Sequence, residues 1–424
     1  MSEAVNIPQL RFPEFREEWK IVKLTDIVDV MTDYVAAGSF ESLRNNVTVY
    51  DKPNYAIYLR LTDLRKGIYH KDLKYVDRSS YDFLNKSNLC GGEILMANIG
   101  ANVGDTYLMP VIDDFATIAP NMIVIKENRL EFLSAFLFYW LNTRKGEKSI
   151  NTAISGSGQP KINKTDLKQI KISLTSQLEQ AKIASFLTAV DNKIEQLSKK
   201  QELLGEYKKG VMQQIFSQVT RFKADDGSDF PDWEDGLLNT LIDNSRKIRY
   251  GIVQPGKYDK NGKYLIRGKD YSNGWEIPSE FFKVSDAIEK KYSKTRVKKG
   301  DVIVCIVGSV GNVMVIPGWL DGANITQTTA RIAPDKNKLN NQYLYFYFQS
   351  LVGRNMIHKH TRVGTRPGLN IEDVEKFSIL LPSLLEQAKI ANFLSSIDNK
   401  IEQVGKQLDE SKQFKKALLQ QMFV

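Results

Sequence analysis

The chain has 424 residues, of which 42% are hydrophobic and 26% charged, a composition that argues against disorder and allows two or three ordinary domains. Its formal net charge of +9 favours an anionic partner such as nucleic acid, although many soluble proteins are also mildly basic. The two cysteines, Cys90 and Cys305, form no CxxC pattern, which argues against a disulfide scaffold and a structural zinc site and suits a reducing cytoplasm. No apolar run approaches the roughly 20 residues of a membrane span, and residues 1–16 lack the apolar core of a signal peptide, so we expect a cytoplasmic protein without a membrane partner.

The first part of the chain is typical of a mixed α/β domain. Short β-rich runs at 56–61, 93–97 and 122–125 are separated by Gly, Asn and Asp, which predicts strands joined by turns. An aromatic helix is expected near 131–142. A Gly-rich basic loop, SGSGQPKIN, follows at 155–163.

A long helix is predicted next, over residues 177–216. Apolar residues recur there with alternating steps of four and three, the pattern of a coiled-coil seam. The seam positions are Ile183, Leu187, Val190, Ile194, Leu197, Gln201, Leu204, Lys208, Val211 and Ile215. Ser176 followed by Glu179 fits a capping box, in which the two residues satisfy backbone N–H groups at the start of the helix.

The same order of elements then occurs a second time. Its predicted segments are strands at 264–267, 302–307 and 329–332, an aromatic helix near 339–350, a Gly-rich basic loop at 360–370 (HTRVGTRPGLN) and a long helix at 384–423. The second seam holds Ile390, Leu394, Ile397, Ile401, Val404, Leu408, Ser411, Lys415, Leu418 and Met422. Ser383 and Glu386 repeat the capping box.

The two halves are an internal duplication. Residues 179–216 match residues 386–423 without a gap, at an offset of 207 residues. Weaker matches upstream pair YLRLTDL with LIRGKDY (Arg60 and Asp63 on Arg267 and Asp270), FLFYWL with YLYFYF, GGEILMANIGANVG (91–104) with KGDVIVCIVGSVG (299–311), and FPEF (12–15) with FPDW (230–233). The helices are close copies, whereas the domains share a framework and differ in most residues.

The simplest way for one chain to bury both seams is antiparallel pairing of its two helices, each of about 40 residues and roughly 60 Å. Pairing between two chains is the alternative. Each helix has six Lys or Arg against five Asp or Glu, so +7 of the net charge of +9 lies outside the helices. The helices therefore fit a spacer or a protein-binding surface, and the domains hold the excess basic charge.

Several residues in and near the Gly-rich loops are candidates for DNA contacts. Glycine allows the backbone to approach phosphate, Arg and Lys neutralise phosphate or bind guanine, and Asn and Gln bind adenine edges. The candidates are Arg60, Thr62, Asp63, Asn98, Asn102, Gln159 and Lys161 in the first domain, and Arg267, Lys269, Asp270, Ser309, Asn312, Gln327, Arg362 and Arg366 in the second. A local salt bridge between Arg60 and Asp63, and plain turns in the loops, are the alternatives.

The sequence contains no convincing catalytic or metal site. His70 stands alone, and His358 with His360 offers too few ligands for a metal. No phosphate-binding GxxxxGK[ST] motif or base-methylating motif occurs. Triplets such as Asp191–Lys193 and Asp398–Lys400 lie within the helix copies, where a solvated helix face explains them better than a nuclease site.

The order of domain, LEQAKI-containing helix, domain and second such helix resembles the specificity subunit of Type I restriction–modification systems. LRFPEF (10–15), YLRLTD (58–63), IRGKD (266–270) and PSLLEQAKI (382–390) are similar to recurring phrases of that family. The resemblance implies an α+β protein: two α/β target recognition domains (1–165 and 221–372) separated by helical spacer regions (166–220 and 373–424) that pair antiparallel in a pseudo-twofold repeat.

The resemblance also implies a function and partners. Each recognition domain would read one half of a bipartite, asymmetric site in double-stranded DNA, and the helices would set the spacing and dock two modification subunits. Half-sites about one helical turn apart (~34 Å) fit between the ends of helices of roughly 60 Å. S-adenosylmethionine, ATP and Mg²⁺ would bind to the modification and the restriction/translocase subunits, so this chain would hold no cofactor and no catalytic residue. A stand-alone methyltransferase or nuclease, and a structural coiled-coil repeat protein, are the alternatives.

Overall fold

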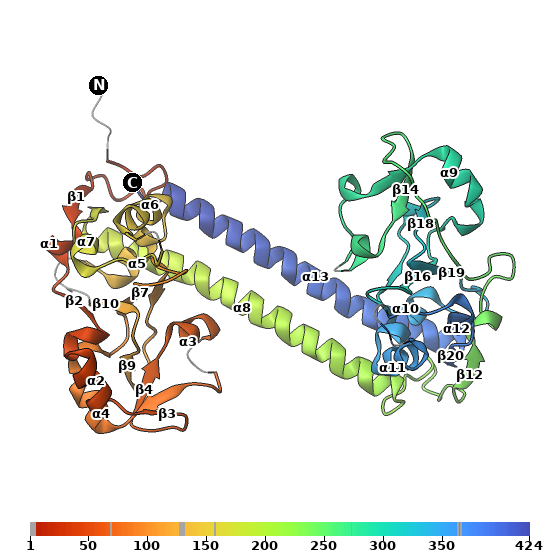
Figure 1. Ribbon diagram of the computed structural model, residues 1–424, viewed down its shortest axis with the longest axis horizontal. Coiled ribbons are helices and arrows are strands. Elements are labelled where there is room, and N and C mark those ends of the chain that lie inside the picture. Colours follow the sequence, from red (N-terminus) through yellow and green to blue (C-terminus); the bar gives the residue numbers. More distant parts are fainter. Residues whose placement is uncertain are drawn as a thin grey trace. The chain divides into compact units, whose positions relative to one another are not determined.

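A computed structural model describes residues 6–67, 70–126, 132–156, 158–272, 274–362, 364 and 367–424. The chain divides into two compact units, Met1–Leu197 with Gln407–Val424 and Ser198–Lys406. Each unit therefore holds one α/β domain together with part of each long helix, α8 (Gln177–Phe216) and α13 (Leu384–Gln421) (Figure 1). Among the described residues, no helix combines the length and the apolar character needed to span a bilayer.

The described residues of unit 1 form three sheets. Its strands are β1 (Lys20–Lys23), β2 (Val30–Asp33), β3 (Val49–Tyr50), β4 (Ala56–Leu59), β5 (Lys74–Val76), β6 (Asn88–Leu89), β7 (Ile94–Ala97), β8 (Thr106–Leu108), β9 (Phe115–Ile118), β10 (Met122–Lys126) and β11 (Lys171–Leu174). Its shorter helices are α1 (Leu24–Ile27), α2 (Phe40–Asn46), α3 (Leu61–Lys66), α4 (Arg78–Phe83), α5 (Ser134–Leu141), α6 (Arg144–Ala153) and α7 (Lys164–Lys168). The strand orders are β1-β11, β2-β10-β7-β8 and β3-β5-β4-β9-β6.

Unit 2 repeats this plan, with fewer strands among its described residues. Its strands are β12 (Glu234–Leu237), β13 (Arg249–Tyr250), β14 (Lys263–Ile266), β15 (Phe282–Val284), β16 (Val302–Cys305), β17 (Val313–Val315), β18 (Asn324–Ile325), β19 (Thr329–Ile332) and β20 (Ser378–Leu381). Its shorter helices are α9 (Asp286–Lys291), α10 (Asn341–Gln349), α11 (Leu351–His360) and α12 (Ile371–Glu375). The strand orders are β12-β20, β13-β19-β16-β17 and β15-β14-β18.

The two domains share two sheets and differ in the third. The two-stranded and four-stranded sheets have the same strand order in both units, and both third sheets contain a parallel pair, β4 with β9 and β14 with β18. In the part of the chain that the structure describes, that sheet has five strands in unit 1 and three in unit 2. The divergence of the two halves is therefore concentrated in and around the third sheet.

The predicted elements agree with the structure. Each of the six predicted strand runs contains a strand, and the two aromatic helices are α5 and α10. A second helix, α6 or α11, follows each aromatic helix and was not predicted. The aromatic helices are predominantly buried, with Phe136 and Leu137 fully enclosed in unit 1 and Tyr343 and Leu344 in unit 2, because they lie between a sheet and a long helix.

The seam of the long helices is confirmed within both units. Lys415 pairs with Asp191 in unit 1, and Lys208 pairs with Asp398 in unit 2, both at 2.6 Å. The residue number rises along one helix where it falls along the other, so the helices pair antiparallel within the chain. The predicted solvated face holds for Lys193 and Lys400, which are exposed. Asp191 and Asp398 are half-buried, because they bind the lysines that interrupt the apolar seams.

The capping boxes are half correct. The Ser176 hydroxyl accepts from the backbone N–H of Glu179 at 3.4 Å. In the same way, the Ser383 hydroxyl accepts from the backbone N–H of Glu386 at 3.3 Å. The Glu179 carboxylate, however, accepts from the Arg11 guanidinium rather than from the backbone of Ser176. Both glutamates bind a neighbouring segment of the domain, as described below.

Candidate nucleic-acid interface

Two Gly-rich segments that are far apart in the sequence meet in unit 1. The N–H of Ile162 donates to the carbonyl of Asn98 at 3.0 Å, and the N–H of Gly100 donates to Pro160 at 2.9 Å. Ser155 and Lys161 exchange backbone hydrogen bonds of 2.8 and 2.9 Å. We call residues 98–104 with 155–161 the first loop pair; within it, Ser157 lies outside the described residues.

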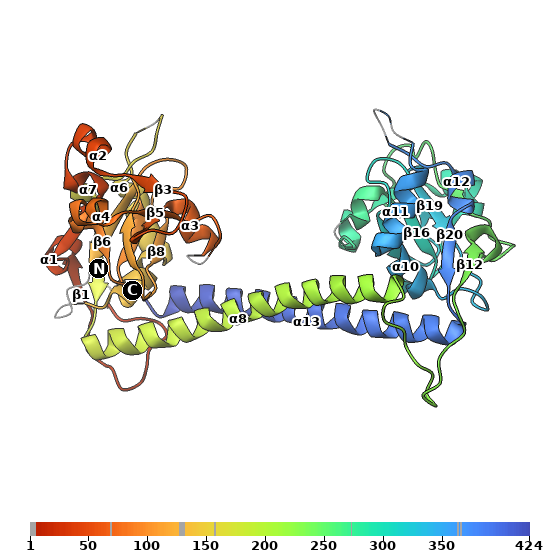
Figure 2. The same cartoon turned by 90° about the horizontal axis from the view of Figure 1, so that it is seen from below.

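Unit 2 contains an equivalent arrangement. The N–H of Leu369 donates to the carbonyl of Ile306 at 2.8 Å, and the backbone N–H of Arg362 donates to the carbonyl of Gly368 at 3.0 Å. Residues 306–312 with 361–369 form the second loop pair; its positions 363, 365 and 366 lie outside the described residues, and with them the candidate Arg366. In each unit the described residues of the loop pair lie on the side of the domain away from the long-helix segments (Figure 2).

Two glycines with positive φ lie at equivalent positions of the loop pairs, next to the helices α6 and α11. Gly104 and Gly311 have φ angles of 92° and 91°, in the region that favours glycine. A Cβ atom on Gly104 would also lie 2.7 Å from the Ile150 side chain on α6, which is too close, whereas one on Gly311 would make an ordinary contact of 3.4 Å with Ile357 on α11. The loops are therefore supported by the fold at equivalent positions in both units.

The loop pairs display many of the predicted residues at the surface. Asn102, Gln159 and Lys161 are exposed in the first, and Ser309 and Arg362 in the second. Asn98 and Asn312 are half-buried, and the side-chain oxygen of Asn98 is enclosed without a partner among the described residues. Polar groups that can bind phosphates or base edges thus converge on one surface of each domain.

The Arg–Asp pairs have a structural role in both units. Asp63 is fully buried and accepts from Arg60 at 2.7 and 3.0 Å, while the Arg60 guanidinium also donates to the carbonyl of Asp72. Arg267 and Asp270 repeat this arrangement at 2.8 to 3.2 Å. Each pair stabilises the turn that directly follows the parallel strand, which is the local salt bridge that the sequence left as an alternative.

The pKa of Asp63 reflects two opposing effects. Burial raises this pKa, and the hydrogen bonds from the Arg60 side chain and backbone and from His70 outweigh burial, so the net pKa is lowered. The carboxylate is therefore ionised and fully enclosed. Contact of the arginines with DNA stays a prediction, and the exposed side chains beside them are Thr62 and Lys269.

The sequence matches a known family over most of its length. Residues 16–204 and 242–411 match the family described as Type I restriction modification DNA specificity domain. The chain belongs to this family. Its two halves are thus two specificity domains, each extending into a long helix.

Curated and structural relatives agree with this assignment. The chain is 26% identical over 429 residues to the Type I restriction enzyme MjaVIII specificity subunit of Methanocaldococcus jannaschii, covering 97% of this chain and 92% of the relative. It is 29% identical over 180 residues to the EcoBI specificity subunit of Escherichia coli, covering 42% of this chain and 38% of the relative. The fold resembles the S subunit of a Type I system from M. genitalium, with a TM-score of 0.60, 15% identity and 99% coverage of both chains.

One residue outside the predicted set, Arg65, and one predicted candidate, Gln327, lie beside the loop pairs. In unit 1, Arg65 at the end of α3 donates to Asp105 at 3.1 Å and to the Tyr107 hydroxyl at 3.2 Å, so α3 contacts the strand end beside the first loop pair. In unit 2, the carbonyl of Thr328 accepts from Ile306 at 2.8 Å, which places the exposed candidate Gln327 next to the second loop pair. Arg65 was missed because its partner is 40 residues away in sequence.

The basic charge is divided unequally between the two specificity domains. Residues 1–176 contain 22 Lys or Arg against 21 Asp or Glu, a net charge of +1. Residues 217–383 contain 25 against 19, a net charge of +6. The second domain therefore supplies most of the long-range attraction to a polyanion.

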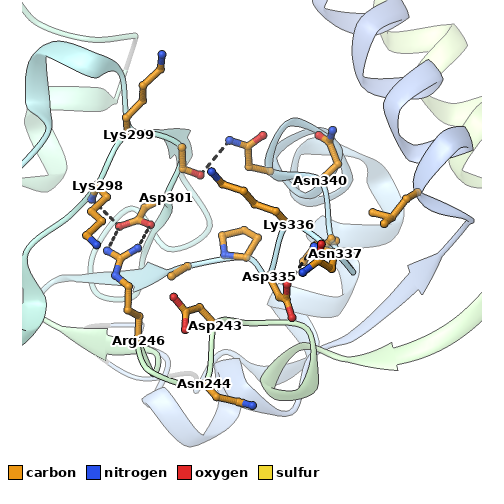
Figure 3. A pocket seen from close by; sticks show the side chains of 16 residues that line it. Asp243, Asn244, Arg246, Lys298, Lys299, Asp301, Asp335, Lys336, Asn337 and Asn340 are labelled. Carbon is orange, nitrogen blue, oxygen red and sulfur yellow. Dashed lines mark hydrogen bonds and ion pairs between the residues drawn. The ribbon is translucent and has the colours of Figure 1, made fainter.

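An open polar groove of about 1120 Å³ in unit 2 contains none of the predicted residues (Figure 3). Arg246 in this groove binds Asp301 at 2.5 and 2.6 Å, so the guanidinium is already neutralised. Lys298, Lys299 and Lys336 line it together with Asp243 and Asp335. The mixed charges do not favour a nucleic acid here over the loop pairs.

Proposed function

We propose that this chain is the DNA-reading subunit of a Type I restriction–modification enzyme. The observation that supports this best is the pair of unlike loop surfaces on a duplicated framework. Two identical readers related by a twofold axis would recognise a palindrome. Two readers with the same framework but different loops and different third sheets recognise two different half-sites, which gives an asymmetric bipartite sequence.

The loop pairs are the DNA-contacting surface in this proposal. Lys161 and Arg362 contribute phosphate or guanine contacts, and Gln159, Asn102 and Ser309 contribute contacts to base edges. Exchange of residues 1–160 for those of a relative is expected to alter one half-site and leave the other unchanged. Sequencing of methylated bases in cells with the exchanged chain measures both half-sites at once.

Salt-dependent binding tests the proposal directly. Because phosphate contacts release counterions, affinity of the wild-type chain for duplex DNA should fall steeply as salt rises. Lys161→Ala should reduce the slope of log affinity against log salt by about one. Lys199→Ala, which removes an exposed lysine from the long helix, is the matched control and should leave the slope unchanged. Binding of the wild-type chain that does not respond to salt would contradict the proposal.

The catalytic steps belong to partner subunits. Modification subunits would bind S-adenosylmethionine and methylate a flipped adenine in each half-site, and a restriction/translocase subunit would use ATP and Mg²⁺. The assembly would act in the cytoplasm, where the DNA lies. The purified chain with S-adenosylmethionine and DNA should show no methyl transfer until modification subunits are added.

We propose that equivalent exposed aromatic residues of the long helices bind two modification subunits. Tyr207 is 53% exposed in unit 2 and Phe414 is 52% exposed in unit 1, and the two positions are related by the repeat offset of 207. Exposed aromatic side chains are frequent anchors of protein interfaces. Two equivalent anchors favour two copies of one partner.

Single and double substitutions test this stoichiometry. Tyr207→Glu or Phe414→Glu alone should leave one modification subunit bound, and the double variant should weaken binding at both positions by about 30-fold. Ser198→Glu adds the same charge at an exposed position of the same helix and should not affect assembly. The mass of the complex, measured by light scattering, distinguishes none, one and two bound subunits.

A further inference from the structure

Two neighbouring polar residues are completely buried near the start of each long helix. Glu179 and Gln180 in unit 1, and Glu386 and Gln387 in unit 2, all have 0% exposure. We call each such pair a Glu–Gln dyad. Burial of a charged and an amide side chain is costly unless each finds partners, so the partners indicate what the dyad does.

The glutamate of each dyad binds the segment that enters the domain. Arg11 donates to Glu179 from Nε at 2.7 Å and from Nη2 at 2.8 Å, a two-bond pairing that fixes both position and orientation. In unit 2, Arg221 donates to Glu386 at 2.9 and 3.3 Å, and the Trp233 indole N–H donates at 3.1 Å.

Packing next to these ion pairs adds a match between the two halves that the sequence analysis did not make. Phe12, which follows Arg11, packs edge-on against Phe186, and Phe222, which follows Arg221, packs in the same way against Phe393. Phe186 and Phe393 are equivalent in the repeat. The Arg-Phe sequences 11–12 and 221–222 are therefore equivalent in the repeat. Lys182 lies over the Phe12 ring at 4.7 Å and the repeat-equivalent Lys389 lies over the Phe230 ring at 5.7 Å, so the match of FPEF with FPDW stays a prediction.

The glutamine of each dyad binds a different part of the domain. The side-chain oxygen of Gln180 accepts from the N–H of Leu133, directly before α5, at 3.0 Å. The side-chain oxygen of Gln387 accepts from the N–H of Asn340, directly before α10, at 2.8 Å. Its amide N–H group also donates to the carbonyls of Pro382 at 2.9 Å and Lys338 at 3.1 Å.

The two contacts together fix how each long helix is rotated beneath its domain. Successive residues of an α-helix are about 100° apart around the axis, so the Glu and Gln side chains leave the helix in different directions. One contacts the entering segment and the other contacts the start of the aromatic helix. Rotation of the helix about its own axis would break both sets of bonds.

We infer that the Glu–Gln dyads are positioning residues that set the rotational orientation of each recognition domain on its long helix, and thereby the half-site spacing that the enzyme accepts. This inference rests on the proposed function. Loss of a dyad contact lets the domain rotate, so that DNA with a spacer one base pair too long or too short is bound nearly as well as the correct DNA. The half-site bases are read by the loop pairs and do not change.

The experiment uses the complex with its modification subunits and duplexes carrying the host site, identified by sequencing of methylated bases, with spacers changed by −1, 0 and +1 base pair. Gln180→Met and Gln387→Met each remove the amide contacts and should reduce discrimination between spacers by about tenfold, the scale of one buried hydrogen bond. Discrimination against a changed half-site base should stay as in wild type. Gln201→Met is the matched control, because Gln201 lies in the helix seam beside Gly405 and not beneath a domain.

A purely structural role predicts a different result. In that case the affinity for all three spacers falls together and their ratio stays at the wild-type value, which overturns the inference. If a glutamine variant fails to fold, Arg11→Lys retains the charge next to Glu179, removes the two-bond geometry and should reduce spacer discrimination in the same way. If the wild-type complex ignores the half-site bases, the proposed function itself fails; if it selects bases and spacer and the variants still select the spacer, only the positioning role fails.

Discussion

Replacing Phe216 by alanine is expected to destabilise unit 2 by about 3 to 5 kcal/mol, the usual cost of removing a fully buried aromatic ring. Phe216 is the last residue of α8 and is 1% exposed. Its ring lies 5.7 Å from those of Tyr343 and Tyr347 and 6.5 Å from that of Trp233. Loss of this ring removes contacts with the aromatic helix and with the segment that enters the second domain.

Phe423→Ala provides the matched comparison, because Phe423 is the repeat equivalent of Phe216. It packs at 5.3 Å from Phe136 and 6.0 Å from Trp19 in unit 1 and is 8% exposed, so a smaller loss is expected there. Because the chain has two units, hydrogen exchange of peptides from each unit is a better measure than a single melting curve. The result to look for is reduced protection in unit 2 for Phe216→Ala and in unit 1 for Phe423→Ala. The end of α8 belongs to unit 2 and the end of α13 to unit 1. Loss of protection in the other unit, or equal loss in both units, would contradict this arrangement.

The long helices were predictable because a repeated seam is a local and periodic signal. The predicted limits 177–216 are those of α8, and the second prediction, 384–423, exceeds α13 by two residues. The capping serines were also correct, since they act within one helical turn. The roles of Glu179 and Glu386 were not predictable, because their partners Arg11 and Arg221 lie more than 160 residues away in the sequence.

The recognition domains were predictable only as far as their strands are apolar. The buried strands β7 and β16 stood out as apolar runs, whereas short strands such as β3 and β6, each of two residues, leave no periodic signal. Their pairing depends on contacts between distant segments. The difference between a five-stranded and a three-stranded third sheet was therefore not visible in the sequence.

The amino-acid composition of the loops identified the candidate site, but the way the loops pair could not be predicted. Glycines and basic residues marked the loops around Gly100 and Lys161, and the backbone bonds that bring these loops together could not be inferred from spacing. The buried carboxylates of Asp63 and Asp270 show the limit of residue type as evidence, because an Arg–Asp pair near a turn serves the fold as readily as a ligand. The exposure of a side chain cannot be read from the sequence. It distinguishes Lys161, which is exposed and accessible to a ligand, from Asp63, which is buried.

Lengthening both long helices by whole heptads is expected to move the half-sites apart without changing their bases. Insertions after Lys199 and after Lys406 are equivalent in the repeat and lie between the ion pairs Lys415–Asp191 and Lys208–Asp398, so both ion pairs and the seam are retained. Seven residues add about 10 Å, or roughly three base pairs of DNA at about 3.4 Å each. An insertion in α8 alone would place Lys208 out of register with Asp398 and should prevent folding.

The size of the insertion decides whether DNA can still be read. Seven added residues make about two helical turns, so they nearly preserve the rotational orientation of the helix. Three added base pairs, in contrast, rotate one half-site relative to the other by roughly a quarter to a third of a DNA turn, which is about 10.5 base pairs. One heptad should therefore abolish methylation at the original site and restore little elsewhere. Three heptads add about 31 Å, close to one turn of DNA, and should give methylation at sites with the same half-sites and a spacer longer by about nine or ten base pairs. Sequencing of methylated bases measures the spacer in each case, and an unchanged spacer in the three-heptad variant would show that the helices do not set it.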